Sequence, residues 1–144
     1  MSLRLFFDSS AFYAAAYSST GAAREVILLS LQGRVKIIVS QDVMEETQRN
    51  IARKAPELVD IYHLFLSLLT LEIVPDPSIT EVREAERHVV QKDAPIVAAA
   101  RKAKVDYLVT FDKKHLLDHP DLVKYVGAEI VTPREVIAFL KPAS

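Results

Sequence analysis

Five short runs of the sequence are apolar at nearly every position, without the polar alternation that marks a strand with one face in water. The runs are LRLFF at 3–7, VKIIVS at 35–40, LEIV at 71–74, YLVT at 107–110 and AEIV at 128–131. Strands of this kind are typical of a parallel sheet that helices cover on both faces. The pattern therefore predicts an α/β protein with a central parallel sheet of about five strands.

The segments between these runs have the features of helices. We expect helices at 9–17, 21–32, 41–55, 57–69, 80–91 and 133–140, an alanine-rich helix that Asp93 opens, and a short helical stretch at 113–117. Pro56 stands where the third helix ends, and Thr80 is expected to cap the fifth. Parallel strands need long crossover connections, which helices supply with a right-handed path.

Composition narrows the possibilities further. A chain of 144 residues, half of them apolar, suits a single domain over 1–144 with a sizeable core. The absence of cysteine excludes a disulfide framework and a thiolate zinc site. The same absence fits a reducing cytoplasm, and no secretory signal or transmembrane stretch is expected, which favours a soluble protein. A net charge of −1 gives no overall positive field, so binding of nucleic acid would need a local basic patch.

Two aspartates stand where expected strands end. Asp8 follows the strand 3–7 directly, and Asp112 follows the strand 107–110 after one phenylalanine. Ligands of open parallel sheets bind beyond the carboxyl ends of the strands, where loops and the starts of helices converge. We therefore expect both carboxylates at the same edge of the sheet.

Two further acids are placed to join them. At about 100° per residue, Glu46 borders the apolar face of the helix 41–55, whereas its neighbour Glu45 points away from that face. Asp93 precedes an apolar stripe at three, four and seven residues on, so its carboxylate lies above the buried face of its own helix.

Taken singly, each of the four acids has a simpler explanation. Asp8, Asp93 and Asp112 suit helix N-caps, and Glu46 suits an ion pair with Arg49 or Arg53 on its own helix. Taken together, the four are better explained by a cation, because carboxylates packed within a few ångströms repel one another unless positive charge neutralises them. Oxygen ligands favour Mg²⁺ or Mn²⁺ over zinc.

Three segments that contain these acids resemble the PIN-domain family, and the likeness spans nearly the whole chain. They are FFDSSAF, VSQDVMEETQRNI and KDAPIVAAARKAKVDYLVTFDKKHL. The closing AEIVTPREVIAFL is also similar to members that are paired with an antitoxin. The resemblance implies a three-layer α/β/α fold and a Mg²⁺- or Mn²⁺-dependent ribonuclease, commonly a homodimer and commonly a VapC-like toxin that a cognate antitoxin inhibits.

The resemblance also assigns roles to residues. It implies that Asp8, Glu46, Asp93 and Asp112 are the catalytic metal ligands. The neighbouring Glu45 makes the glutamate assignment ambiguous, and Asp112 stands where some members carry asparagine. In the expected reaction, bound cations activate water and neutralise the leaving oxygen, which leaves 5′-phosphate ends on RNA. Hydroxyls near the edge of the sheet would orient carboxylates or phosphate, and these belong to Ser9, Ser10 and Thr110.

Basic residues flank the expected site. Arg49 and Arg53 lie beside Glu46, and three more follow Asp112, namely Lys113, Lys114 and His115. Together they predict a local patch for the RNA backbone. The alternative is that exposed cations merely confer solubility. The apolar stretch at 61–69 is explained by core packing or by a dimer or antitoxin surface.

Other classes of protein fit less well. A phosphoaspartyl hydrolase also has an aspartate after its first strand, but it needs a second one where this chain has Ser10. A receiver domain needs an acidic pair and a late lysine that this sequence lacks. A PIN-like module that binds RNA or a partner protein without cleaving remains an alternative, because intact acids do not prove turnover.

Overall fold

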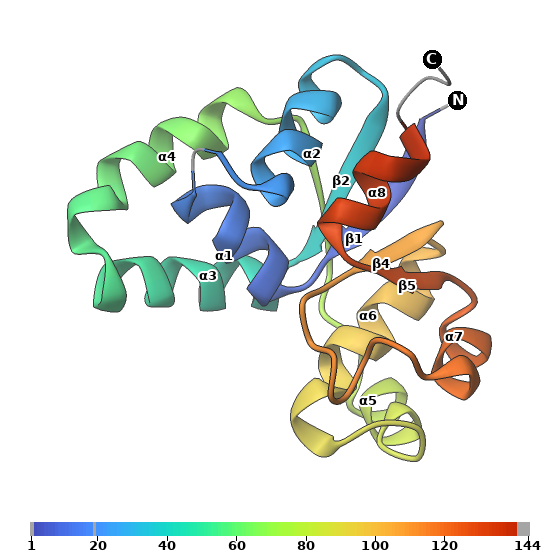
Figure 1. Cartoon of the computed structure of the whole chain (residues 1–144). Coiled ribbons are helices and arrows are strands. Elements are labelled where there is room, and N and C mark those ends of the chain that lie inside the picture. Colours follow the sequence, from blue (N-terminus) through green and yellow to red (C-terminus); the bar gives the residue numbers. More distant parts are fainter. Residues whose placement is uncertain (1, 19, 141–144) are drawn as a thin grey trace.

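The computed structural model describes residues 2–18 and 20–140. A parallel sheet of five strands runs through its centre in the order β3-β2-β1-β4-β5 (Figure 1). The strands are β1 (Leu3–Phe7), β2 (Val35–Ser40), β3 (Leu71–Val74), β4 (Tyr107–Val109) and β5 (Glu129–Val131). All five apolar runs are thus strands, and the predicted α/β/α fold class is confirmed.

Two groups of helices enclose the sheet (Figure 1). The first contains α1 (Ser9–Tyr17), α2 (Ala22–Leu31), α3 (Gln41–Lys54), α4 (Val59–Leu68) and α8 (Pro133–Leu140). The second contains α5 (Ile79–Ala85), α6 (Ala94–Ala103) and α7 (Pro120–Val126), while short 3₁₀ turns at Pro56–Leu58 and Gln91–Asp93 precede α4 and α6. No helix in the described residues is long and apolar enough to cross a membrane.

The order of the strands defines a switch point beside β1. From β1 the chain moves to β2 and β3 on one side, and it then returns to place β4 and β5 on the other side. Connections that leave neighbouring strands in opposite directions open a crevice at their carboxyl ends. Here that crevice lies beyond the ends of β1 and β4, on the lower side of the molecule in Figure 1.

The expected helix 80–91 is wrong at both ends. The helix is α5, Ile79–Ala85, and Ser78 rather than Thr80 caps it. The Ser78 hydroxyl accepts from the Glu81 amide at 3.1 Å, and the Glu81 carboxylate accepts from the Ser78 amide at 2.8 Å. This reciprocal capping box satisfies two donors that Thr80 would have left open. Beyond Ala85 the chain turns, because residues 86–88 are exposed and have no apolar face to bury.

The expected helical stretch at 113–117 is also wrong. The segment is a turn in which Leu116 and Leu117 donate their amides to the Asp112 carbonyl at 3.2 and 2.9 Å. The turn leads to a positive φ of 63° at Asp118, after which Pro120 starts the unpredicted helix α7. Proline is favoured in the first turn of a helix, and it disfavours helical geometry in the residue before it.

Two core hydroxyls, those of Thr47 and Tyr62, make no hydrogen bond among the described residues. Thr47 of α3 is fully buried, and its Oγ1 has no partner among the described residues. We expect Thr47→Val to stabilise the protein by about 1 kcal/mol, because valine keeps the shape and removes the unpaired polar atom. Urea unfolding measures the change. Thr47→Ser is the contrasting variant: it keeps the hydroxyl, loses a methyl group and should destabilise. Equal stability of the two variants would refute this explanation.

Candidate metal centre

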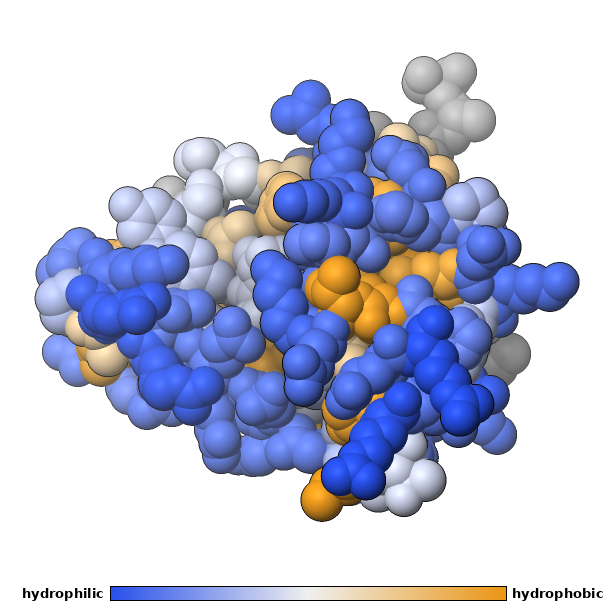
Figure 2. Space-filling view, turned by 90° about the horizontal axis from the view of Figure 1, so that it is seen from below, coloured by the Kyte–Doolittle hydropathy of each residue, from blue (hydrophilic) through white to orange (hydrophobic). Residues whose placement is uncertain are grey.

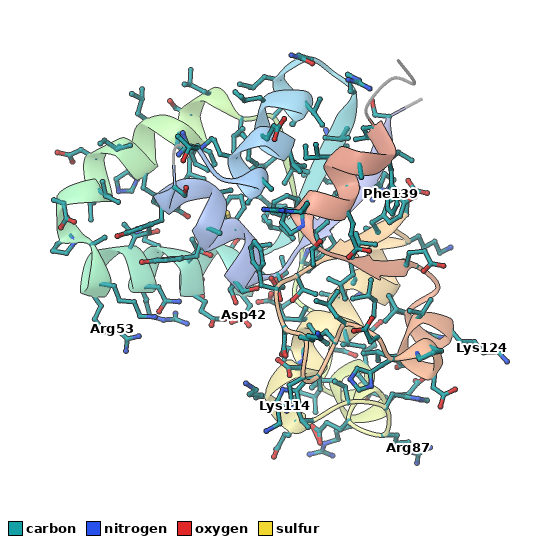
Figure 3. The ribbon with its side chains drawn as sticks, in the orientation of Figure 1. Asp42, Arg53, Arg87, Lys114, Lys124 and Phe139 are labelled. Carbon is teal, nitrogen blue, oxygen red and sulfur yellow. The ribbon has the colours of Figure 1, made fainter. Side chains whose placement is uncertain are left out.

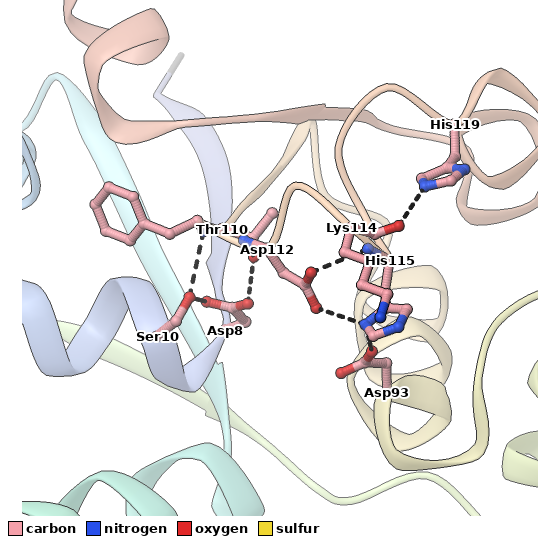
Figure 4. A network of polar contacts seen from close by, with 9 residues as sticks. Asp8, Ser10, Asp93, Thr110, Asp112, Lys114, His115 and His119 are labelled. Atoms are coloured by element: carbon pink, nitrogen blue, oxygen red, sulfur yellow. Dashed lines mark hydrogen bonds and ion pairs between the residues drawn. The ribbon is translucent and has the colours of Figure 1, made fainter.

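Three of the four predicted acids lie around the crevice beyond β1 and β4 (Figure 4). Asp8 follows β1, Asp112 follows β4 in the loop that leads to α7, and Asp93 ends the 3₁₀ turn before α6. Parallel strands deliver the first two to one edge, and the start of α6 brings the third to the same place. Glu46 comes from the first half of α3, which begins at the end of β2.

Asp8 is buried and saturated with donors. Its Oδ1 accepts from the Ser10 hydroxyl at 2.7 Å and from the Ala11 amide at 2.9 Å, while its Oδ2 accepts from the Thr110 hydroxyl at 2.5 Å. The bond from the Ala11 amide caps the N-terminus of α1, so Asp8 does have the helix-capping role that its position in the sequence suggested. The other two bonds come from side chains and connect Asp8 to its surroundings.

Two hydroxyls join the loop after β4 to Asp8. The Ser10 hydroxyl accepts from the Phe111 amide at 3.2 Å, and the Thr110 hydroxyl accepts from the Asp112 amide at 3.0 Å (Figure 4). Each hydroxyl therefore donates to Asp8 and accepts from the loop that carries Asp112. Ser10 and Thr110 thus orient two of the acids, whereas the described residues form no hydrogen bond with the Ser9 side chain.

Asp93 and Asp112 approach each other with a histidine between them. One ligand atom from each of Asp93, Asp112 and His115 can be chosen so that all three lie within 4.8 Å of one another. The His115 Nδ1 is 3.5 Å from Asp93 Oδ2 and 3.4 Å from Asp112 Oδ2. Asp93 Oδ2 is buried and has no hydrogen-bond partner in the described part of the chain. The Asp93 side chain makes no capping hydrogen bond to α6, so a role as helix cap does not explain this aspartate.

Charge repulsion connects the acids electrostatically. Burial raises the pKa of Asp93, the nearby Asp112 raises it further, and Glu46 adds a smaller effect in the same direction. Burial also raises the pKa of Asp8; the Thr110, Ala11 and Ser10 hydrogen bonds oppose it, and Asp112 adds to it. Each carboxylate therefore disfavours charge on its neighbour, and a cation at this edge would relieve both.

Glu46 lies outside the group of three ligand atoms. It is half-buried on α3, and no ion pair joins it to Arg49 or Arg53 in the residues that the structure describes. Asp42, one turn earlier on the same face of α3, is an acid that sequence reasoning missed. Burial raises the pKa of Asp42, as do Asp76 and Glu46. Asp42 could have been found in the sequence, because residues four apart on a helix lie on the same face and Asp42 precedes Glu46 by four.

The structure places the expected basic residues on several sides of the centre. Arg49, Arg53, Lys113 and Lys114 are all exposed. Arg53 lies at the end of α3 that is remote from Asp42, whereas Lys114 lies below the sheet (Figure 3). His115 differs from these cations, because its imidazole is partly buried and turned toward the acids. Its position three residues after Asp112 is the sequence feature that could have indicated its closeness to the acids.

A groove adjoins the centre on its loop side. Its volume is about 520 Å³, and its lining includes Arg87, His88, Lys114, His115 and His119, together with Glu86 and Asp121. A larger hollow of about 720 Å³ lies beside β5 and α8, and none of the four predicted acids lines it. Seen from below, the face with the strand ends is mostly hydrophilic (Figure 2). None of the four acids lines the smaller groove either, and it adjoins the centre through His115 alone among the three grouped ligand residues.

The residues present fit a divalent cation. An orphaned, buried carboxylate oxygen of Asp93 faces a second carboxylate and an imidazole nitrogen, which are all metal-ligand atoms. Asp112 uses Oδ1 to accept from the His115 amide at 3.0 Å and leaves Oδ2 toward the other two side chains. Asp93, Asp112 and His115 would hold the ion, with Asp8 and Glu46 around them.

Relief of repulsion gives a stability prediction. Asp93→Asn should raise the free energy of unfolding of the metal-free protein by about 1 kcal/mol, or roughly 2–4 °C in Tm, because one of two neighbouring negative charges is lost. Mn²⁺ should then raise the Tm of the wild type much more than that of the variant. Thermal unfolding with EDTA or Mn²⁺ measures both effects. Exposed Asp118 provides the control Asp118→Asn, and equal shifts in all three proteins would contradict the prediction.

A five-stranded parallel sheet between helices, with acids gathered at its switch point, defines an α/β protein with a candidate metal centre. The sequence matches the PIN domain over residues 4–114, and the chain belongs to the PIN-domain family. No curated protein matches the sequence.

Solved structures share this fold at low sequence identity. PAE2754 from Pyrobaculum aerophilum has a TM-score of 0.64 and 19% identity, with 97% of this chain and 96% of that chain covered. VapBC2 from Rickettsia felis, bound to a DNA fragment from their promoter, has a TM-score of 0.65 and 17% identity over 90% and 98% of the two chains. FitAcB from Neisseria gonorrhoeae has a TM-score of 0.63 and 12% identity over the same shares.

Proposed function

We propose that this protein is an endoribonuclease that hydrolyses phosphodiester bonds with Mg²⁺ or Mn²⁺. The observation that carries the proposal is the buried Oδ2 of Asp93, which accepts no hydrogen bond and lies close to Asp112 and His115 at the switch point of a PIN fold. A buried carboxylate oxygen without a donor is costly unless a cation completes it.

The side chains divide the work in the proposed reaction. A bound cation supplies an activated water and neutralises charge on the phosphate. Asp93 and Asp112 would hold it, and Asp8 and Glu46 would complete the negative surroundings. Ser10 and Thr110 keep Asp8 and the Asp112 loop in register through the hydroxyl bridges described above. The reaction is expected to leave a 5′-phosphate.

RNA would reach the centre over its polar lower face. Lys114 and Arg87 line the groove beside His115 and offer positive charge to a backbone, while Arg49, Arg53 and Lys113 are exposed outside the groove. The groove also contains Glu86 and Asp121, so phosphate contacts would concentrate at the two cations rather than along its whole length.

We further propose that the protein is a cytoplasmic toxin of a toxin–antitoxin pair, with a cognate antitoxin as partner and a homodimer as its assembly. Support comes from the VapC-like sequence pattern and from the likeness in fold to VapBC2 and FitAcB. Exposed apolar residues on α4, namely Ile61, Leu64 and Leu68, offer a surface for such contacts.

The test is cleavage of a 5′-labelled single-stranded RNA by the purified protein. Cleavage should require Mg²⁺ or Mn²⁺, stop in EDTA and give 5′-phosphate products that a phosphate-dependent exonuclease degrades. Undiminished cleavage in EDTA would overturn the metal mechanism. Binding of RNA without any cleavage would favour the alternative, a non-catalytic PIN-like module.

A further inference from the structure

We propose that His115 supplies a nitrogen ligand to the cation held by Asp93 and Asp112, so that the centre selects first-row transition ions such as Mn²⁺ over Mg²⁺. The inference rests on the metal centre of the proposed function, but it does not depend on RNA as the substrate. It replaces the expectation of an oxygen-only ligand set.

The distances around His115 suit a shared ion. Its Nδ1 lies 3.4 Å from Asp112 Oδ2 and 3.5 Å from Asp93 Oδ2, and it forms a hydrogen bond with neither. Charge-assisted hydrogen bonds are shorter, at about 2.7–2.9 Å. Two ligand atoms that each lie about 2.1 Å from one ion stand about 3.0–3.5 Å apart for bond angles between a right angle and a tetrahedral one. The two distances at His115 therefore match the spacing of ligand atoms around one ion, and the three ligand atoms all lie within 4.8 Å of one another.

Local structure fixes the backbone that carries the imidazole. The His115 amide donates to Asp112 Oδ1 at 3.0 Å, and the amides of Leu116 and Leu117 donate to the Asp112 carbonyl. Both leucines are buried and anchor the turn. The turn that carries His115 is therefore held by hydrogen bonds and by buried side chains. Asp112 uses Oδ1 in this turn, so its Oδ2 remains available to a cation. A pre-positioned ligand loses little conformational freedom on binding.

The chemistry of the ligand set predicts a graded selectivity. Mg²⁺ prefers oxygen ligands and retains its waters, so an imidazole adds little to its binding. Transition ions accept nitrogen, and their affinity for mixed nitrogen and oxygen sites rises from Mn²⁺ to Co²⁺. The contribution of His115 should therefore grow in the order Mg²⁺, Mn²⁺, Co²⁺. A histidine that only balanced the charge of two carboxylates would not produce this order.

The deciding experiment is calorimetric titration of Mg²⁺, Mn²⁺ and Co²⁺ into the full chain without RNA. The wild type should bind Mn²⁺ at least about tenfold more tightly than Mg²⁺. His115→Ala should lose about tenfold in Mn²⁺ affinity and more for Co²⁺, while Mg²⁺ affinity stays within about twofold. His119→Ala is the matched control: this histidine is in the same loop, contacts the Lys114 carbonyl at 2.9 Å and lies outside the ligand group.

Pulsed electron paramagnetic resonance of bound Mn²⁺ gives a second readout that needs no variant to fold well. The wild type and His119→Ala should show coupling to an imidazole ¹⁴N, and His115→Ala should lack it. Equal losses for all three ions, or the absence of nitrogen coupling in the wild type, would overturn the inference. If the protein shows the expected ion selectivity but does not cleave RNA, the proposed nuclease function is wrong and the proposal that His115 is a ligand still holds.

Discussion

Asp112→Asn is expected to slow metal-dependent cleavage of RNA by about a thousandfold, which corresponds to about 4 kcal/mol of lost transition-state stabilisation. The Asp112 Oδ2 faces both Asp93 and His115, so the substitution removes one of two charges that would hold the cation. An asparagine oxygen can still accept from the His115 amide, as Oδ1 does now at 3.0 Å. The turn should therefore survive while the metal centre fails.

Single-turnover cleavage of labelled RNA at saturating Mn²⁺ measures this effect. Asp118→Asn is the control, because Asp118 is exposed in the same loop and its φ of 63° suits asparagine as well as aspartate. The control should cleave at the wild-type rate. If Asp112→Asn keeps more than about a tenth of the activity, Asp112 is no metal ligand and the proposed centre is misassigned.

The fold was predictable because the central strands β1 and β2 are buried over most of their length. Leu5, Phe6 and Phe7 of β1 are fully buried, as are Ile37, Ile38 and Val39 of β2. A strand that is covered on both faces has apolar residues at nearly every position. This pattern can be recognised in the sequence without knowing which distant residues the strand contacts. The α7 region had no such signal. Its turn is set by bonds to the Asp112 carbonyl and by Pro120, which periodicity does not register.

The candidate centre was predictable in part for a related reason. Asp8 and Asp112 follow neighbouring parallel strands, so topology alone brings them to one edge. Whether an aspartate at that edge is a cap or a candidate ligand is a matter of side-chain geometry. Asp8 caps α1, whereas Asp93 makes no cap and has a buried oxygen that accepts no hydrogen bond. His115 joins the group from the turn that stands after β4 in place of the expected helix.

The same geometry separates two roles among the acids. Asp8 is 6% exposed and already accepts three hydrogen bonds, so its first role is to hold the loop of Asp112 through Thr110 and Ser10. Asp93 and Asp112 have oxygens directed at each other and at His115. We therefore rank these two above Asp8 and Glu46 as direct ligands, while all four contribute negative charge.

Thr110→Val is expected to destabilise the protein by about 2–3 kcal/mol and to slow cleavage at least tenfold. The Thr110 hydroxyl donates to buried Asp8 and accepts from the Asp112 amide. Burial raises the pKa of Asp8, and the bond from Thr110 is the largest effect opposing it. Valine has the same shape, so packing is retained while the carboxylate loses a donor and the Asp112 loop loses its anchor.

Thr110→Ser separates the hydroxyl from the methyl group. Serine keeps both hydrogen bonds and should recover most of the stability and the cleavage rate, although it removes a buried methyl that costs about 1 kcal/mol. Urea unfolding in EDTA gives the stability, and RNA cleavage in Mn²⁺ gives the rate. If valine is tolerated better than serine, methyl packing outweighs the hydroxyl. In that case the bridge from Asp8 through Thr110 to Asp112 does not position the centre.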